Sequence, residues 1–344
     1  MDSEAQSQPV PPAGRDPAAP DADTPRAIVA RPGIGDQVFR GILRASGMSV
    51  FVITGLILVF LIVRSLKAFR FMGLDFLTTQ SWIVYNPQHF GIAAILPFGI
   101  LIALIAMIIA VPTGIAVALY ISEYAPPRLQ RPLVALIDLM AAIPSIIFGL
   151  WGLLFLEPRI LGFDSWLGRH LGFIPVFSFR LPSLPASYAT STFIAGVVVS
   201  LMVIPIVTSL SRQVFSQAPQ GEREGAYALG ATRWGMIRAV VLPFGRGGVI
   251  GATMLGLGRA LGETIAVTLI IVPSFHFSYH VLESGGNSIA ATIALDFQSF
   301  PDAGSMGLSA LMAAGLVLFG MTLIVNMLGA IVIGRSRSGL ATAD

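Results

Sequence analysis

The sequence has no cysteine and one lysine, and only 11% of its 344 residues are charged. Without cysteine there is no disulfide framework, thiolate nucleophile, zinc–thiolate site or iron–sulfur cluster. A soluble domain carries roughly a quarter of its residues as Asp, Glu, Lys and Arg, so a soluble enzyme is excluded as the default interpretation. The net charge of +3 is spread along the chain and forms no basic stripe of the kind that binds nucleic acid.

The motifs of the common catalytic and nucleotide sites are also missing. Lys67 has no glycine-rich sequence before it, which excludes a Walker A loop. The chain also lacks an H-E-x-x-H pair and a G-x-S-x-G elbow. We therefore expect no catalytic residue, metal site or cofactor, and any ATP hydrolysis must come from another chain.

Long apolar runs dominate what remains. Hydrophobic residues make up 55% of the chain, and its mean hydropathy is +0.80. A membrane-spanning helix needs about 20 mostly apolar residues. Six runs reach this length, which predicts an all-α membrane protein with six transmembrane helices: 43–63, 93–121, 133–156, 191–211, 247–273 and 307–333.

The N-terminal segment 1–36 differs from the rest in composition. It holds seven prolines and several aspartates with few large apolar residues, a composition that predicts a disordered tail. It has no apolar core of the kind that a signal peptide requires. We expect one six-helix domain to occupy 37–343.

The distribution of basic residues predicts the orientation in the membrane. An even number of spans places both termini on one side. When Arg44 at the edge of the first span is counted with the tail, that side carries 14 of the 21 Lys and Arg residues, and the opposite side carries six. The positive-inside rule then places both termini and the loop 212–246 in the cytoplasm.

Three charged residues fall inside predicted spans, where a charge costs several kcal/mol unless it is paired or hydrated. In a continuous fifth helix, Glu263 lies one turn beyond Arg259 on the same face. The two residues then form either a structural ion pair or part of a hydrated substrate pathway. Asp138 lies nearer the cytoplasmic end of its helix, where we expect a basic partner.

The cytoplasmic segment 212–246 has the pattern of a short amphipathic helix interrupted at Gly230. On its own, this pattern is typical of a helix at the membrane surface. Its expected apolar face is Ala226, Leu229, Trp234 and Ile237, and three arginines are expected to be available to a partner: Arg223, Arg233 and Arg238.

The same segment resembles the coupling motif of the permease subunits of bacterial ABC importers, E-A-A-x3-G-x9-I-x-L-P. The matching residues are Glu224, Ala226, Gly230, Leu242 and Pro243, whereas Gly225 and Val240 depart from the pattern. The stretches 120–126, 143–151 and 255–264 are similar to phosphate-specific transport permeases. The tail and the long first outer loop are more like the C-type subunit of that system than its A-type partner.

The resemblance implies the type I ABC importer permease fold and half of a transport pathway in a bacterial cell membrane. It also implies a homologous A-type permease, two copies of a separate ATPase that dock on the coupling segment, and an extracytoplasmic phosphate-binding protein. Arg259 and Glu263 would then contact the substrate, since an arginine fork pairs with phosphate oxygens.

Three alternatives remain open at this point. The chain is a permease for another oxyanion such as sulfate or molybdate, a proton-coupled secondary transporter that uses Glu263 and Asp138, or a scaffold whose segment 212–246 binds a sensor kinase. Substrate competition, uncoupler sensitivity and pull-down experiments separate them.

Overall fold

The computed structural model describes residues 33–83, 89–178, 188–275, 278–300, 302 and 304–338. Most of the predicted tail lies outside this part, and the first helix begins at Ile34, so that it includes the last three residues of the predicted tail. The chain divides into two compact units, one up to Thr54 and one from Gly55 onward. The features below all belong to the second unit unless stated otherwise.

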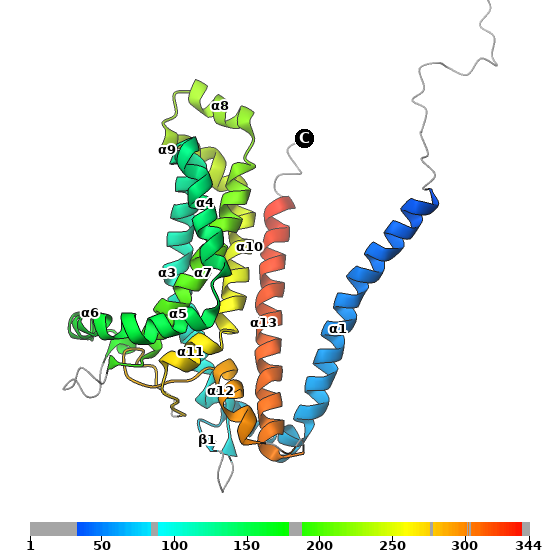
Figure 1. Ribbon diagram of the computed structural model, residues 1–344, viewed down its shortest axis with the longest axis vertical. Coiled ribbons are helices and arrows are strands. Elements are labelled where there is room, and N and C mark those ends of the chain that lie inside the picture. The colour runs from blue at the N-terminus through cyan, green and yellow to red at the C-terminus, as the bar shows by residue number, and fades with distance from the viewer. Residues whose placement is uncertain are drawn as a thin grey trace, which may run out of the picture. The chain divides into compact units, whose positions relative to one another are not determined.

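Six helical segments of the described residues are long and apolar enough to cross a membrane, which confirms the predicted number. They are Ile34–Met72, Ile92–Tyr124, Ser145–Leu171, Thr192–Ser216, Arg233–Leu261 and Met306–Gly334. Figure 1 shows the helices α8 (Gln220–Ala228) and α9 (Arg233–Met236) at one end of the long helices, with α12 (Ile289–Asp296) at the opposite end.

The first and last long helices, α1 (Ile34–Met72) and α13 (Met306–Ser338), meet near the end of α1. The hydroxyl of Ser309 donates to the carbonyl of Arg64 and accepts from the amide of Ala68. Most of the other large apolar side chains of α1 are exposed in the isolated chain. This is the expected composition of a surface that faces lipid or other subunits.

The main core lies between α3 (Leu96–Leu119), α7 (Thr192–Ser216) and α10 (Leu242–Leu261). Small residues allow these helices to approach closely. A Cβ on Gly114 would lie 2.8 Å from Val207, and a Cβ on Gly256 would lie 2.8 Å from Val203. The tight contacts fix α10 against the α3–α7 pair.

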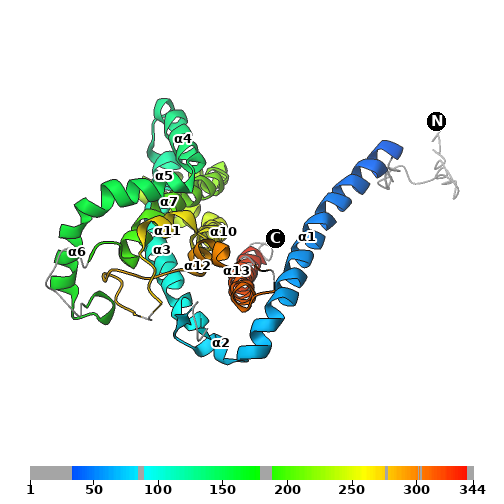
Figure 2. The ribbon, with the colours of Figure 1, turned by 60° about the horizontal axis from the view of Figure 1, so that its bottom comes forward.

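The third predicted span, 133–156, is not one helix. The chain forms α4 (Pro127–Ala142), breaks at Ile143 and Pro144, and continues as α5 (Ser145–Trp151), a π-helical turn and α6 (Glu157–Leu171). Pro144 has no amide hydrogen to continue the helix ladder. The apolar segment of spanning length therefore begins after the proline, and α6 extends away from α10 in both views (Figures 1 and 2).

The fifth predicted span, 247–273, is also divided. The helix α10 ends at Leu261, and a separate short helix, α11 (Ile265–Ile270), follows after three residues. The α5 helix packs on α11 through Gly149, where a Cβ would lie 2.9 Å from the Cα of Ala266. The unbroken fifth helix expected from hydropathy is therefore wrong.

A second core lies at the end of the long helices that is opposite α8 (Figure 1). It includes the short helix α2 (Asp75–Thr78) and the antiparallel pair β1 (Trp82–Ile83) and β2 (His89–Phe90). The indole N–H of Trp82 donates to Asp296 Oδ2 over 3.1 Å. Burial raises the pKa of Asp296, and this hydrogen bond opposes the shift.

Candidate functional site

The predicted coupling segment begins where α7 ends at Ser216 and runs into the short helix α8. No residue of α8 is fully buried, and only Arg223 and Ala226 are even partly withdrawn from solvent. These two residues are three positions apart and share one side of the helix. The helix therefore touches the body of the chain along a narrow line and presents its other sides outward.

Gly230 ends α8 in a Schellman motif. Its amide donates to the carbonyl of Tyr227 over 2.9 Å, and the amide of Ala231 donates to that of Ala226 over 3.0 Å. This motif needs a residue in the left-handed region at the position after the cap. Gly230 has a φ of 81°, so the predicted interruption at this glycine is present and has a backbone cause.

After the turn, the chain leads into α10 through α9 and the π-helical turn Ile237–Val241. The hydroxyl of Thr232 caps α9 by accepting from the amide of Gly235. Leu242 and Pro243 occupy the first two positions of α10, directly after the π-helical turn, and the ring of Pro243 fixes its φ. The end of the motif therefore forms a rigid entry into α10.

The predicted apolar face of this segment does not form one surface. Ile237 is fully buried and Ala226 is partly buried, whereas Leu229 is 91% exposed and Trp234 is 56% exposed. The Schellman turn at Gly230 changes the chain direction, so the periodicity does not continue across it. Leu229 and Trp234 are thus available to a partner protein instead.

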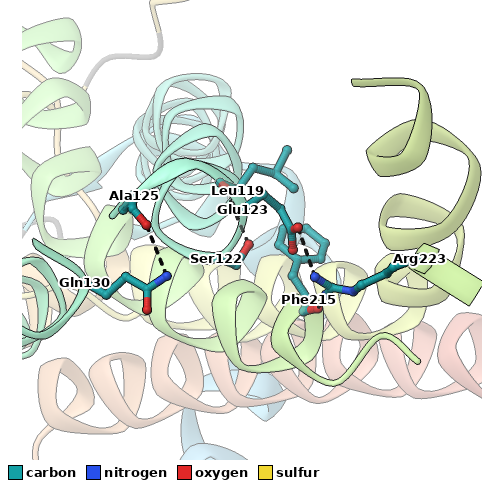
Figure 3. A network of polar contacts seen from close by, with 7 residues as sticks. All are labelled: Leu119, Ser122, Glu123, Ala125, Gln130, Phe215 and Arg223. Atoms are coloured by element: carbon teal, nitrogen blue, oxygen red, sulfur yellow. Dashed lines mark hydrogen bonds and ion pairs between the residues drawn. The ribbon is translucent and has the colours of Figure 1, made fainter. Parts of the chain in front are cut away.

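Arg223 connects α8 to two long helices (Figure 3). Its Nη1 lies 3.0 Å from Glu123 Oε2, and its Nη2 donates to the carbonyl of Phe215 over 2.6 Å. Glu123 belongs to the π-helical turn Tyr120–Tyr124, which extends α3, and Phe215 lies in the last turn of α7. We call these three residues the α8 anchor. The expectation that Arg223 is available to a partner is therefore wrong.

Glu123 was not singled out from the sequence, because it lies just past the end of a predicted span. The available signal was that the stretch 120–126 resembles the same permeases as the coupling motif. Its partner is 100 positions away, a separation that periodicity cannot bridge.

Arg259 lies in the last turn of α10 and is exposed in the isolated chain. The neighbouring Leu255, one turn earlier, is also exposed, while Gly256 and Ala260 face the core. Within the described residues Arg259 makes no ion pair. Among the described residues, this side of α10 therefore carries an unneutralised guanidinium, which inside a membrane needs water, an anion or another subunit.

Glu263 does not lie on the same helical face as Arg259, as the sequence suggested, because α10 ends between them. Its side chain is 8% exposed, and its Oε1 accepts from the amide of Ala266 over 3.2 Å. The carboxylate thus caps the start of α11. The structural Arg259–Glu263 ion pair is absent from the described part of the chain.

Asp138 lines a hollow of about 410 Å³ between α4 and α7. The basic residues Arg131 and Arg212 line the same hollow, so the expected basic neighbours are present. No ion pair joins them to Asp138 among the residues that the structure describes.

Comparisons with known proteins agree with this arrangement. Residues 110–338 match the family described as binding-protein-dependent transport system inner membrane component. The chain is 38% identical over 307 residues to the phosphate transport system permease protein PstC 2 of Mycobacterium tuberculosis, covering 89% of this chain and 94% of that protein. It is 39% identical over 304 residues to PstC of Haemophilus influenzae, covering 88% and 94% respectively.

A solved structure supports the fold alone. The crystal structure of a bacterial ABC transporter involved in the import of the acidic polysaccharide alginate aligns with a TM-score of 0.52 at 17% identity, covering 87% of this chain and 99% of that one. The family match and the two relatives identify the chain as a multi-pass inner-membrane permease of the binding-protein-dependent transport system family.

Proposed function

We propose that the chain is the permease subunit of an ATP-driven phosphate importer and forms half of its translocation pathway. The observation that carries this proposal is the coupling motif, which forms an exposed helix and leads directly into the helix that bears Arg259. The choice of phosphate as the substrate is supported by the relatives that are named as phosphate transport permeases. Because the sequence has no Walker A loop, ATP hydrolysis is assigned to a separate subunit.

The proposed assembly contains a homologous A-type permease, two ATPase subunits and an extracytoplasmic phosphate-binding protein. Both termini and the segment 212–246 face the cytoplasm, as the basic residues indicate. Glu224, Ala226, Gly230, Leu242 and Pro243 form the ATPase coupling site. Leu229 and Trp234, which are exposed beside this motif, provide apolar surface for the docked ATPase.

Arg259 is proposed to contact phosphate as it crosses the membrane. A guanidinium stays charged and offers paired donors to two oxygens of one anion. Because none of the described residues forms an ion pair with Arg259, its donors can bind a transient ligand. Glu263 acts on the same pathway by holding the break between α10 and α11, so that it shapes the region next to Arg259 without neutralising it.

The test is ATP-dependent phosphate uptake into proteoliposomes that contain the complete complex. Replacing Arg259 with Gln removes hydrogen bonds to a charged group, which contribute about 1.5–3 kcal/mol each. We therefore expect uptake to fall roughly ten- to hundredfold, with an intermediate value for Arg259→Lys. The exposed Arg128, substituted in the same way, is the matched control and should keep normal uptake.

Three results would contradict the proposal. Normal phosphate uptake by Arg259→Gln would remove this residue from the pathway. If sulfate or molybdate inhibits the uptake as strongly as unlabelled phosphate does, the complex transports another oxyanion. Uptake that an uncoupler abolishes, and that continues after loss of ATP, would identify a proton-driven transporter.

A further inference from the structure

The α8 anchor carries an inference that goes beyond the general docking of an ATPase on this segment, and it rests on the proposed function. Two residues of α8, Arg223 and Ala226, attach this helix to the described part of the chain. Ala226 packs beside the buried cluster that includes Phe215 and Ile237. Arg223 makes the polar attachment, and its side chain is 20% exposed while that of Glu123 is 4% exposed.

The geometry of Arg223 divides its attachment between two helices. One nitrogen of the guanidinium binds the carboxylate at the end of α3, and the other binds the last turn of α7 through a backbone carbonyl. The guanidinium is planar and rigid, so its two bonds keep a fixed orientation relative to each other. A displacement of α8 is therefore applied to the ends of α3 and α7 together.

These two helices form the main core with α10, the helix that bears Arg259. Close contacts at Gly114 and Gly256 leave little space for α3, α7 and α10 to slide past one another. A movement imposed at the cytoplasmic ends of α3 and α7 consequently reaches α10 through packed side chains. The described residues thus form a continuous physical route from α8 to Arg259.

Stability alone gives a weak reason for an ion pair at this place. Buried ion pairs contribute little net stability, because both charges lose their hydration. Two atoms of the pair, Glu123 Oε1 and Arg223 Nε, are buried without a hydrogen-bond partner among the described residues. An apolar contact like that of Ala226 would hold the helix without this desolvation. The ion pair adds a directed connection that resists both pulling and rotation.

We propose that Arg223 is a positioning residue that makes α8 and the cytoplasmic ends of α3 and α7 move as one body during ATP hydrolysis. Glu123 and the carbonyl of Phe215 are its two points of attachment. The anchor does not contact phosphate, and it does not form the docking surface. It determines how much of the work of ATP hydrolysis reaches the transport pathway.

The first experiment measures phosphate transported per ATP hydrolysed by the complete reconstituted complex. We expect Glu123→Gln and Arg223→Gln to assemble and to hydrolyse ATP, with a transport ratio lowered roughly tenfold or more, since each leaves the opposite charge buried without its partner. The matched control is Arg128→Gln. This residue is exposed in the first turn of α4 and has no part in the motif or the anchor.

Restoring the charges in reversed order tests the contact itself. The double variant Glu123→Arg with Arg223→Glu re-forms the ion pair but has no donor for the Phe215 carbonyl. We expect it to recover part of the ratio that each single variant loses. Two outcomes would overturn the proposal and leave the anchor with a role in folding alone. The transport ratio does not recover in the double variant, or both single variants fail to assemble and the double variant does not restore assembly.

The absence of cysteine allows a second test of the same movement. In Glu123→Cys with Arg223→Cys, a short bismaleimide joins the two positions covalently. If α8 and the end of α3 move as one body, cross-linking should restore the ratio that the unlinked double variant has lost. A cross-linked complex that remains uncoupled, or whose residual transport stops, would show that α8 moves relative to α3 and would refute the proposal.

These outcomes are separable from the fate of the proposed function. If the wild-type complex transports a different anion, the phosphate assignment fails, but the transport ratio of that anion still tests the anchor. If wild-type phosphate transport is normal and the anchor variants keep the wild-type ratio, only the anchor proposal fails.

Discussion

Substitution of Gly230 separates two reasons for a glycine in the coupling motif. A Cβ at this position would meet nothing within 4 Å in the part of the chain that the structure describes, whereas the φ of 81° lies in the region that L-residues avoid. Within this chain the cost of Gly230→Ala is therefore one of backbone conformation alone, about 1–2 kcal/mol. That energy lowers the population of the Schellman turn roughly five- to thirtyfold relative to alternative conformations.

The order of variants is more informative than any one of them. Asn is larger than Ala but tolerates the left-handed region, and a β-branched residue tolerates it least. If the backbone is the cause, ATPase co-purification and uptake should decrease in the order Gly, Asn, Ala, Val at position 230. Gly221→Ala is the control, because Gly221 is helical, has open space around it and lies outside the motif.

The opposite order of Asn and Ala would refute this reasoning. A close approach of the ATPase at position 230 penalises side-chain volume, so Asn would then be worse than Ala. Equal and unimpaired coupling in all variants would show that the turn has no role in coupling.

Three further predictions concern other parts of the chain. Gly149→Ala should lower the free energy of unfolding, measured in detergent, by about 1–3 kcal/mol, because the new Cβ would lie 2.9 Å from the backbone of Ala266. Asp296→Asn should raise the melting temperature relative to wild type, and the difference should grow as pH rises above the ordinary pKa of 3.8. Burial raises the pKa of Asp296, so its ionised form costs stability, whereas the amide oxygen of Asn still accepts the hydrogen bond from Trp82. A difference in melting temperature that does not depend on pH would contradict this. Deletion of residues 1–32 should leave uptake near normal, because that composition does not support a packed structure, and a large loss at unchanged membrane levels would assign the tail a binding role.

The sequence predicted the features that depend on local composition. The number of membrane helices follows from apolar runs of spanning length, and the end of α8 follows from the glycine in its motif. The divided fifth span was missed because Gly262 and Glu263 interrupt an apolar run only briefly, and hydropathy continues through α11. From the sequence, a glutamate that caps the next helix cannot be distinguished from a glutamate in a continuous helix four residues after an arginine, so the role of Glu263 was not predicted.

The α8 anchor shows what local patterns cannot provide. Arg223 reads as a solvent-exposed arginine of an amphipathic helix, and Glu123 reads as a loop residue beyond a span. Their contact depends on how α3, α7 and the segment after α7 come together at one end of the molecule. A single sequence contains no measure of that proximity.

The narrow attachment of α8 also has an evolutionary consequence. Because Arg223 and Ala226 are the only residues of the helix withdrawn from solvent, selection for the permease fold acts on one side of α8. The outward residues, such as Glu222 and Tyr227, are constrained only by the subunit that they meet. In the proposed complex, a permease and its ATPase can therefore diverge together at this surface, and gene duplicates can acquire exclusive partners, without any change in the helices of the main core.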